Sequence, residues 1–161
     1  MDTLTRTQLL ELDEPRLQAI CRCEACRGTG PGGQKRNKTS TAVRVTHADT
    51  GLSASDDQER SQQLNKHRAL QKLRLQFALK LREAPVPWNG PVPSLKSERY
   101  VCWLAVLLDH LYACNFSMAD TAAAMNSSTG KLVREMAKTP AFWQLVNAER
   151  AERGFNPLRP D

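Results

Sequence analysis

The sequence predicts an α+β fold in two parts. The first is a small, mostly antiparallel sheet with an exposed Gly-Gly-Gln loop and a packed basic helix, and the second is an all-α, helix-turn-helix-like domain. Strand-like alternation is confined to the first half, the pattern after residue 96 is entirely helical, and four prolines stand between them. We therefore expect a domain over residues 1–83, a Pro-rich linker over 84–93 and a helical domain over 94–161.

The first half begins with two short helices, expected over Thr3–Leu12 and residues 14–20, where Pro15 fits the first turn. Alternating small or β-branched and charged residues then predict strands, and the tight turn at residues 49–51 predicts an antiparallel return. The expected strands are Cys21–Cys26, Thr41–His47 and Leu52–Ala54.

A long basic helix is expected next and should run to about Glu83. Ser55 has Gln58 three residues on, which is the capping-box spacing, and marks its start. The apolar stripe expected to lie on the sheet is Leu70, Leu73, Phe77 and Leu81. The cations on its other faces are expected to stay solvated or to meet phosphate: Lys66, Arg68, Lys72, Arg74, Lys80 and Arg82.

The Pro-rich residues 84–93 exclude a helix and favour an extended spacer of roughly 30 Å, at about 3.1 Å per residue. Beyond them, Ala122, Asn126 and Leu132 resemble the spacing of a helix-turn-helix, in which a small Ala lets two helices cross closely. Ser127 departs from that pattern, which usually has an apolar residue there. The expected helices are Ser97 to Cys114, Met118 to Met125, Ser128 to Lys138, and Thr139 to the residue before Gly154.

Composition narrows the class of protein. The net charge is +6, and an excess of +5 lies within residues 1–90, which suits a nucleic-acid partner. Five cysteines, an odd number, with no secretory signal indicate reduced thiols in a cytoplasmic protein. The longest apolar run, Val101–Leu108, is too short to span a bilayer, so no membrane association is expected.

The central stretch of the chain is residues 28–38, which contain four of its eight glycines. Such a run packs no apolar face and lets the backbone approach a partner closely. A single amide, Gln34, follows the last glycine, and three cations come next: Lys35, Arg36 and Lys38. The run is not a P-loop, because Lys35 comes two residues after Gly33 instead of directly after it. We expect this loop to reach into a polyanionic partner.

Six short blocks occur here in order: Gly32-Gly33-Gln34, Asn37-Lys38-Thr39, Ala42-Val43-Arg44, Thr50-Gly51, Glu59-Arg60-Ser61-Gln62 and Asn65-Lys66. Together they resemble the catalytic domain of bacterial class I peptide chain release factors and their ribosome-rescue relatives, over roughly residues 16–83. The resemblance implies hydrolysis of the ester between a nascent peptide and tRNA on the ribosome. It implies large-subunit rRNA and peptidyl-tRNA as partners, and no cofactor.

The resemblance gives the catalytic roles to Gly32, Gly33 and Gln34. The backbone N–H of Gln34 is expected to stabilise developing negative charge, and its side chain to orient the attacking water. The two glycines allow close approach to RNA. Gln34 is also a candidate substrate of a glutamine methyltransferase. The expected phosphate contacts in this half are Lys35, Arg36, Lys38, Arg60 and Lys66.

Two further clusters have competing interpretations. Cys21, Cys23 and Cys26 have spacing that suggests zinc, but a structural site needs four ligands, and the other two thiols lie in the helical half. Buried free thiols and no metal are therefore expected. In the helical half, three cations share one face of the presumed recognition helix and are candidate RNA contacts: Lys131, Arg134 and Lys138.

The chain is too short for the stop-codon-reading domain of full-length release factors, so the resemblance favours a codon-independent rescue factor. Two alternatives stay open. One is a DNA- or RNA-binding regulator that uses the helix-turn-helix, and the other is a non-catalytic ribosome-associated factor. DNA is not the expected partner, because residues 91–161 carry a net charge of only +1.

Overall fold

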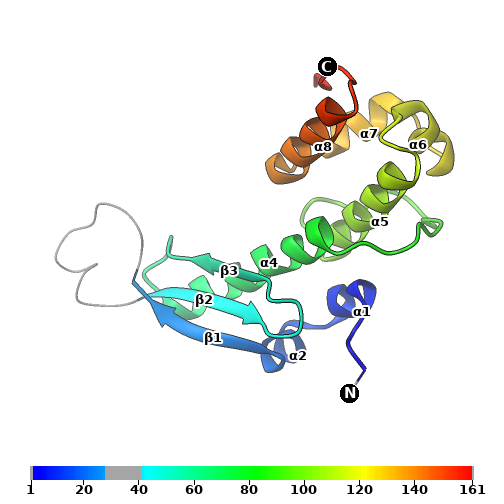
Figure 1. Ribbon diagram of the computed structural model, residues 1–161. Helices are drawn as coiled ribbons and strands as arrows, with labels where there is room; N and C mark the ends of the chain where they lie inside the picture. The colour runs from blue at the N-terminus through cyan, green and yellow to red at the C-terminus, as the bar shows by residue number, and fades with distance from the viewer. Residues whose placement is uncertain (1, 28–40, 161) are drawn as a thin grey trace. The chain divides into compact units, whose positions relative to one another are not determined.

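The computed structural model describes residues 2–27 and 41–160, which divide into two compact units, Met1–Leu81 and Arg82–Asp161. The first unit contains a three-stranded antiparallel sheet in the order β1-β2-β3 (Figure 1). Its strands are β1 Cys21–Cys26, β2 Ala42–His47 and β3 Ser53–Asp56. Its helices are α1 Arg6–Glu11, α2 Glu14–Ala19 and α4 Gln62–Lys80. The predicted α+β class is confirmed.

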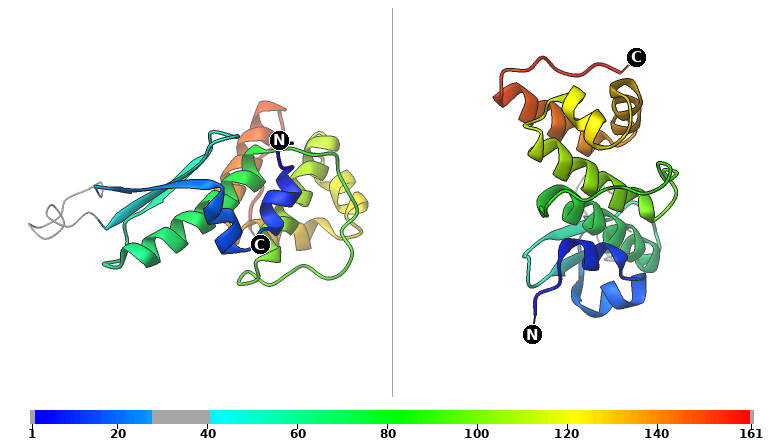
Figure 2. Two further views of the ribbon diagram at one scale, coloured as in Figure 1. Left: turned by 90° about the horizontal axis from the view of Figure 1, so that it is seen from below. Right: turned by 90° about the vertical axis from the view of Figure 1, so that its right-hand side faces the viewer.

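The core of the first unit lies between the sheet and α4, which runs alongside the strands (Figure 1 and the left view of Figure 2). Val45 from β2 and three residues of the predicted α4 stripe, Leu70, Leu73 and Phe77, have no exposed surface. His47, at the end of β2, places its ring edge-on to Phe77 at 5.3 Å. The tight turn is also as expected, with Gly51 in the left-handed region at φ +69°.

The start of α4 differs from the expected one. Ser55 lies in β3, opposite Arg44 of β2, because strand pairing satisfies its backbone and outweighs the local capping-box spacing. The N-cap is Ser61 instead, whose side chain accepts from the Leu64 N–H at 3.3 Å. At the other end α4 stops at Lys80, so Leu81 is an extended C-cap and does not continue the apolar stripe.

Arg74 also differs from the expectation of a solvated or phosphate-binding side chain, since it is only 3% exposed. Its guanidinium donates to the carbonyl of Leu10 at 3.0 Å and to that of Leu12 at 2.5 Å. These carbonyls belong to the end of α1, where a helix leaves acceptors without intrahelical partners. Arg74 was expected to be solvated or to meet phosphate, and that expectation is wrong: it is a buried link between α4 and the end of α1.

The second unit contains α5 Arg99–Ala113, α6 Met118–Ala124, α7 Thr129–Met136 and α8 Pro140–Glu152. Asn115, Asn126 and Gly154 follow the C-caps of α5, α6 and α8 in the left-handed region. In each case the next N–H bonds back five residues, as from Ser127 to the Ala122 carbonyl at 2.8 Å. Ala122 and Leu132 are buried on either side of the α6–α7 turn, as the helix-turn-helix spacing required.

The Pro-rich segment has no regular secondary structure, as expected, but it and the two residues before it are bound to α5. Arg82 pairs with the buried carboxylate of Asp109 at 2.9 Å, and the N–H of Glu83 donates to the same oxygen at 3.2 Å. Within the Pro-rich segment, the carbonyl of Val86 lies 2.9 Å from Nε2 of His110. These contacts all lie within the second unit. Within residues 2–27 and 41–160, no helix has the length and apolar character needed to cross a membrane.

Candidate functional site

The β1–β2 hairpin ends at the pair Cys26 and Ala42, and the covalent connection between its strands carries the Gly-Gly-Gln segment. The predicted catalytic residues, and the three cations next to them, lie outside the described residues: Gly32, Gly33, Gln34, Lys35, Arg36 and Lys38. The described part of the candidate site is therefore the Cys26–Ala42 end of this hairpin, from which the Gly-Gly-Gln segment continues in the chain, and the first turns of α4.

Asn65 joins these two elements. Its side chain is fully buried, and its Nδ2 donates to the carbonyl of Thr41 at 2.8 Å and to the carbonyl of Glu59 at 2.9 Å. Its Oδ1 accepts from the N–H of Glu59 at 2.9 Å. Thr41 is the residue that precedes β2. A single side chain thus fixes the entry to β2 and the segment that leads into α4. The sequence block Asn65-Lys66 contained this residue, but spacing gave no sign of its role.

The bend between β3 and α4 is braced by charge. Asp56 pairs with Lys72 at 2.7 Å and accepts from the N–H of Gln58 at 3.1 Å. Burial opposes ionisation of Asp56, but the hydrogen bonds from Lys72 and Gln58 and the nearby positive charges prevail, so the pKa of this carboxyl lies below its ordinary value. One turn closer to the start of α4, Arg68 pairs with Glu59 at 2.7 Å. Two ion pairs therefore tie the bend to α4.

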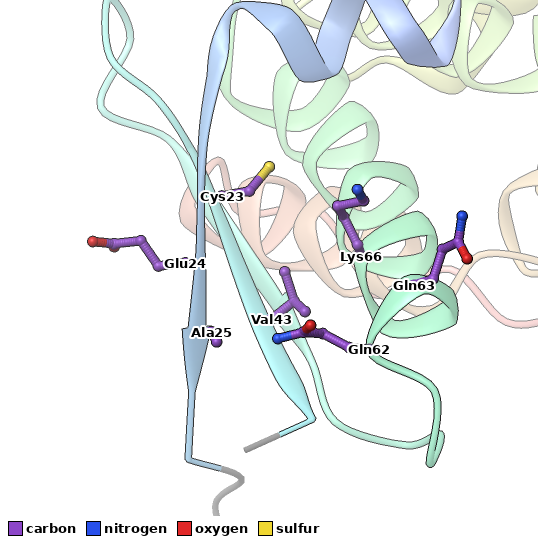
Figure 3. Close-up of a pocket in the computed structure, with 7 residues that line it drawn as sticks. All are labelled: Cys23, Glu24, Ala25, Val43, Gln62, Gln63 and Lys66. Carbon is purple, nitrogen blue, oxygen red and sulfur yellow. The ribbon is translucent and has the colours of Figure 1, made fainter. Parts of the chain in front are cut away.

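A groove of about 310 Å³ lies between β1 and the first turns of α4 (Figure 3). It exists because α4 covers β2 and β3 and leaves this face of β1 open, so that Cys23 is exposed. Cys23 points toward α4 and Glu24 points away from it (Figure 3). The lining residues are Cys23, Glu24, Ala25, Val43, Gln62, Gln63 and Lys66. Two amides and one cation from α4 therefore line a groove that they share with apolar side chains of β1 and β2, toward the Cys26–Ala42 end of the hairpin.

The predicted phosphate contacts that lie within the described residues fall into three groups. Lys66 lines the groove and Arg60 is exposed in the bend before α4, so the structure brings these two to the same end of the first unit. Lys131 and Arg134 are exposed on α7 in the second unit. Lys138, just beyond α7, is exposed but its ammonium holds the Glu135 carboxylate at 2.8 Å, which reduces its capacity to bind phosphate.

None of the three neighbouring cysteines is fully buried: Cys21 and Cys26 are half-buried and Cys23 is exposed, so the expectation of buried thiols is wrong. Burial, together with the negative charge that Cys23 can carry, raises the pKa of the Cys21 thiol to about 11. Cys21 therefore stays protonated near neutral pH, which disfavours its action as a nucleophile and as a metal ligand. Within the described ranges no three His, Cys, Asp or Glu side chains are grouped to hold a metal ion.

Comparison with known proteins identifies the first unit. Residues 17–85 match the RF-1 domain family. Over this span the chain is similar to that family. This span contains all three strands, α4 and the Gly-Gly-Gln segment, and it confirms the resemblance to the catalytic domain of class I release factors. The match to the RF-1 domain ends before α5, so the four helices α5 to α8 lie outside it.

Individual relatives support the RF-1 assignment. The chain is 50% identical over 58 residues to peptide chain release factor 1 of Nautilia profundicola, which is 36% of this chain and 16% of the relative. It is 40% identical over 77 residues to peptide chain release factor 1 of Leifsonia xyli subsp. xyli, 45% of this chain and 22% of the relative. A peptide chain release factor homolog of Escherichia coli is 45% identical over 87 residues, 54% of this chain and 39% of the relative. The chain thus spans well under half the length of these relatives.

Proposed function

We propose that this chain hydrolyses the ester that joins a nascent peptide to tRNA on the ribosome, and does so without reading a stop codon. The observation that carries this proposal is an RF-1 domain with an intact Gly32-Gly33-Gln34. Two kinds of relative, named as release factors and as a release factor homolog, share this domain.

In the proposed reaction a water attacks the ester carbonyl carbon, the bond to the 3′ oxygen of tRNA breaks, and a proton passes to that leaving oxygen. The backbone N–H of Gln34 serves as the hydrogen-bond donor to the charge that develops. A glutamine side chain has no basic group, so it orients the water, and the proton acceptor belongs to the tRNA or the ribosome.

Binding to the ribosome is assigned to cations at two places. Arg60 and Lys66 lie at the end of the first unit that contains the groove, and Lys131 and Arg134 lie on α7. Lysine and arginine bind phosphates without reading the base sequence. A helical unit that presents such cations suits RNA binding that does not depend on the codon, which is why rescue of stalled ribosomes is preferred to stop-codon-dependent termination.

The test uses ribosomes that carry a labelled peptidyl-tRNA on an mRNA with no stop codon. We expect the whole chain to release the peptide, and Gln34→Pro to bind ribosomes without releasing it. A parallel reaction with a stop codon in the A site should proceed at a similar rate. Release only with a stop codon would contradict codon independence, and binding without release would point to a non-catalytic factor. Nanomolar binding to duplex DNA with no release would favour a regulator.

A further inference from the structure

We propose that Asn65 is a positioning residue for the hydrolysis proposed above. It fixes the point at which the chain enters β2, and hence the anchor from which the segment carrying Gln34 is presented. The inference rests on the proposed function. It concerns a residue of α4 that lies 31 positions after Gln34 in the chain.

The first step is the geometry of the amide. Asn65 has no exposed surface, and both of its Nδ2 donors are engaged by backbone carbonyls, those of Thr41 and Glu59. With Glu59 it exchanges two hydrogen bonds, of 2.9 Å each, so the amide joins this segment as a neighbouring strand would. Since all three contacts are to backbone, they need an amide at position 65 and no particular side chain at the other two positions.

The second step is the place that the amide fixes. The β1–β2 ladder ends at Cys26 and Ala42, and Thr41 is one residue beyond that last pair. The carbonyl of Thr41 is therefore held by Asn65 and not by a partner strand. Gln34 lies seven residues before Thr41 in the chain. The other arm of the clamp is itself fixed, because the Glu59 carboxylate pairs with Arg68, which lies on α4 as Asn65 does.

The third step is the consequence for rate. A reacting group displaced by about 1 Å can lose about 10²-fold in rate, although it still binds. Asn65→Leu keeps the approximate volume and removes all three hydrogen bonds. Asn65→Asp keeps an acceptor for the Glu59 N–H but turns an oxygen toward two carbonyl oxygens. Asn65→Gln retains the amide on a chain that is one methylene longer.

A matched control exists on the same helix. Arg74 is likewise a buried polar clamp that donates to two backbone carbonyls, but those are at Leu10 and Leu12, at the end of α1. Arg74→Met should destabilise the domain in the way that Asn65→Leu does. Only the Asn65 variants should disturb the entry to β2. The pair separates loss of stability from loss of positioning.

The experiment measures peptide release from ribosomes with labelled peptidyl-tRNA, over a range of concentrations of the whole chain. We expect Asn65→Leu and Asn65→Asp to lower the maximal rate by about 10- to 100-fold, with a change in half-saturating concentration below about threefold. Asn65→Gln should recover part of that rate, and Arg74→Met should retain it. Amide exchange at residues 41–43 should rise in the two impaired variants and stay unchanged in Arg74→Met.

Three results would contradict the positioning role of Asn65. An unchanged maximal rate in folded Asn65→Leu overturns the positioning role while the proposed function stands. So does an equal rate loss in Arg74→Met, because stability alone would then explain both. If wild-type protein releases no peptide, the proposed function fails, and the positioning role fails with it.

Discussion

Asp56 and Lys72 form a 2.7 Å ion pair that joins the last residue of β3 to the middle of α4. The carboxylate is almost fully buried, whereas the ammonium is half exposed. The pair holds the strand end at the place where the chain turns toward the helix. Its stabilising effect depends on pH, since it needs the carboxylate to be ionised.

Stability should therefore fall in acid, and Asp56 should contribute to that fall. Its folded-state pKa is lowered, so its contribution is complete above the unfolded-state pKa of about 3.9 and is lost as the pH falls through the folded value. Asp56→Asn should flatten the pH dependence of the free energy of unfolding in that window. Lys72→Met should flatten it too and lower stability by about 1–3 kcal/mol at neutral pH. Denaturant titrations from pH 2 to 7 test this, and an unchanged slope in both variants would contradict it.

The second prediction separates the backbone of Gln34 from its side chain. Gln34→Ala keeps the backbone donor and should leave measurable peptide release. Gln34→Pro removes the donor and should lose about 2.7–4 kcal/mol of transition-state stabilisation, or about 10²–10³-fold in rate. Single-turnover release assays measure both. Equal losses would show that the side chain, and not the backbone N–H, carries the effect.

The third prediction concerns α7. Lys131→Ala with Arg134→Ala should weaken ribosome binding and flatten its salt dependence by roughly 0.7–0.9 log units for each phosphate contact removed. Lys138→Ala should have a smaller effect, because its ammonium already pairs with Glu135. Co-sedimentation across a salt series compares the three. A Lys138 effect equal to that of the other cations would argue against selective use of α7.

The fourth prediction is that the cysteines hold no metal. Elemental analysis of protein purified without chelator should find well under one zinc per chain. Cys23→Ser should fold with little loss of stability, because the thiol is exposed on β1. Stoichiometric zinc, or loss of folding in Cys23→Ser, would overturn the prediction.

The fifth prediction uses two glycines of the helical unit. Gly154 follows α8 with φ +79°, so Gly154→Ala should lower the free energy of unfolding by about 1–2 kcal/mol. Gly130 is inside α7, and a Cβ there would meet only the Arg134 guanidinium, at an ordinary 3.6 Å. Gly130→Ala should therefore stabilise by about 0.4–1 kcal/mol. Thermal unfolding measures both changes in stability. If the two substitutions shifted the unfolding temperature in the same direction, the different backbone requirements of Gly154 and Gly130 would be contradicted.

Much of the fold followed from local patterns. The strand Cys21–Cys26 lies at its predicted bounds, and the Ser128 cap opens α7 as expected. The errors arose where a distant partner overrides a local preference. Ser55 has a valid capping spacing but pairs with Arg44 across the sheet, and Arg74 is charged but lies within reach of the carbonyls at the end of α1. Neither partner can be inferred from spacing along the helix.

In the candidate site, too, some features could be predicted from local patterns and others depend on distant partners. The order of the six short sequence blocks predicted the similarity to release factors, and the positive charge of the first half predicted contacts with phosphate. The clamp at Asn65 could not be found from the sequence, because its partners are backbone atoms 24 and 6 residues away that any residue type would supply. An amide inside an amphipathic helix is ordinarily solvated, and only the packing of the hairpin against α4 buries this one.

The contact between Arg82 and Asp109 decides how the chain can be divided for expression in pieces. A cut within the Pro-rich residues would leave Arg82 on the N-terminal fragment and remove that cation from a carboxylate with no exposed surface. A C-terminal fragment that keeps this ion pair therefore starts at or before Arg82, where the second compact unit starts. A fragment that begins at residue 94 would be a poor substitute for the helical unit, although it retains every one of its helices.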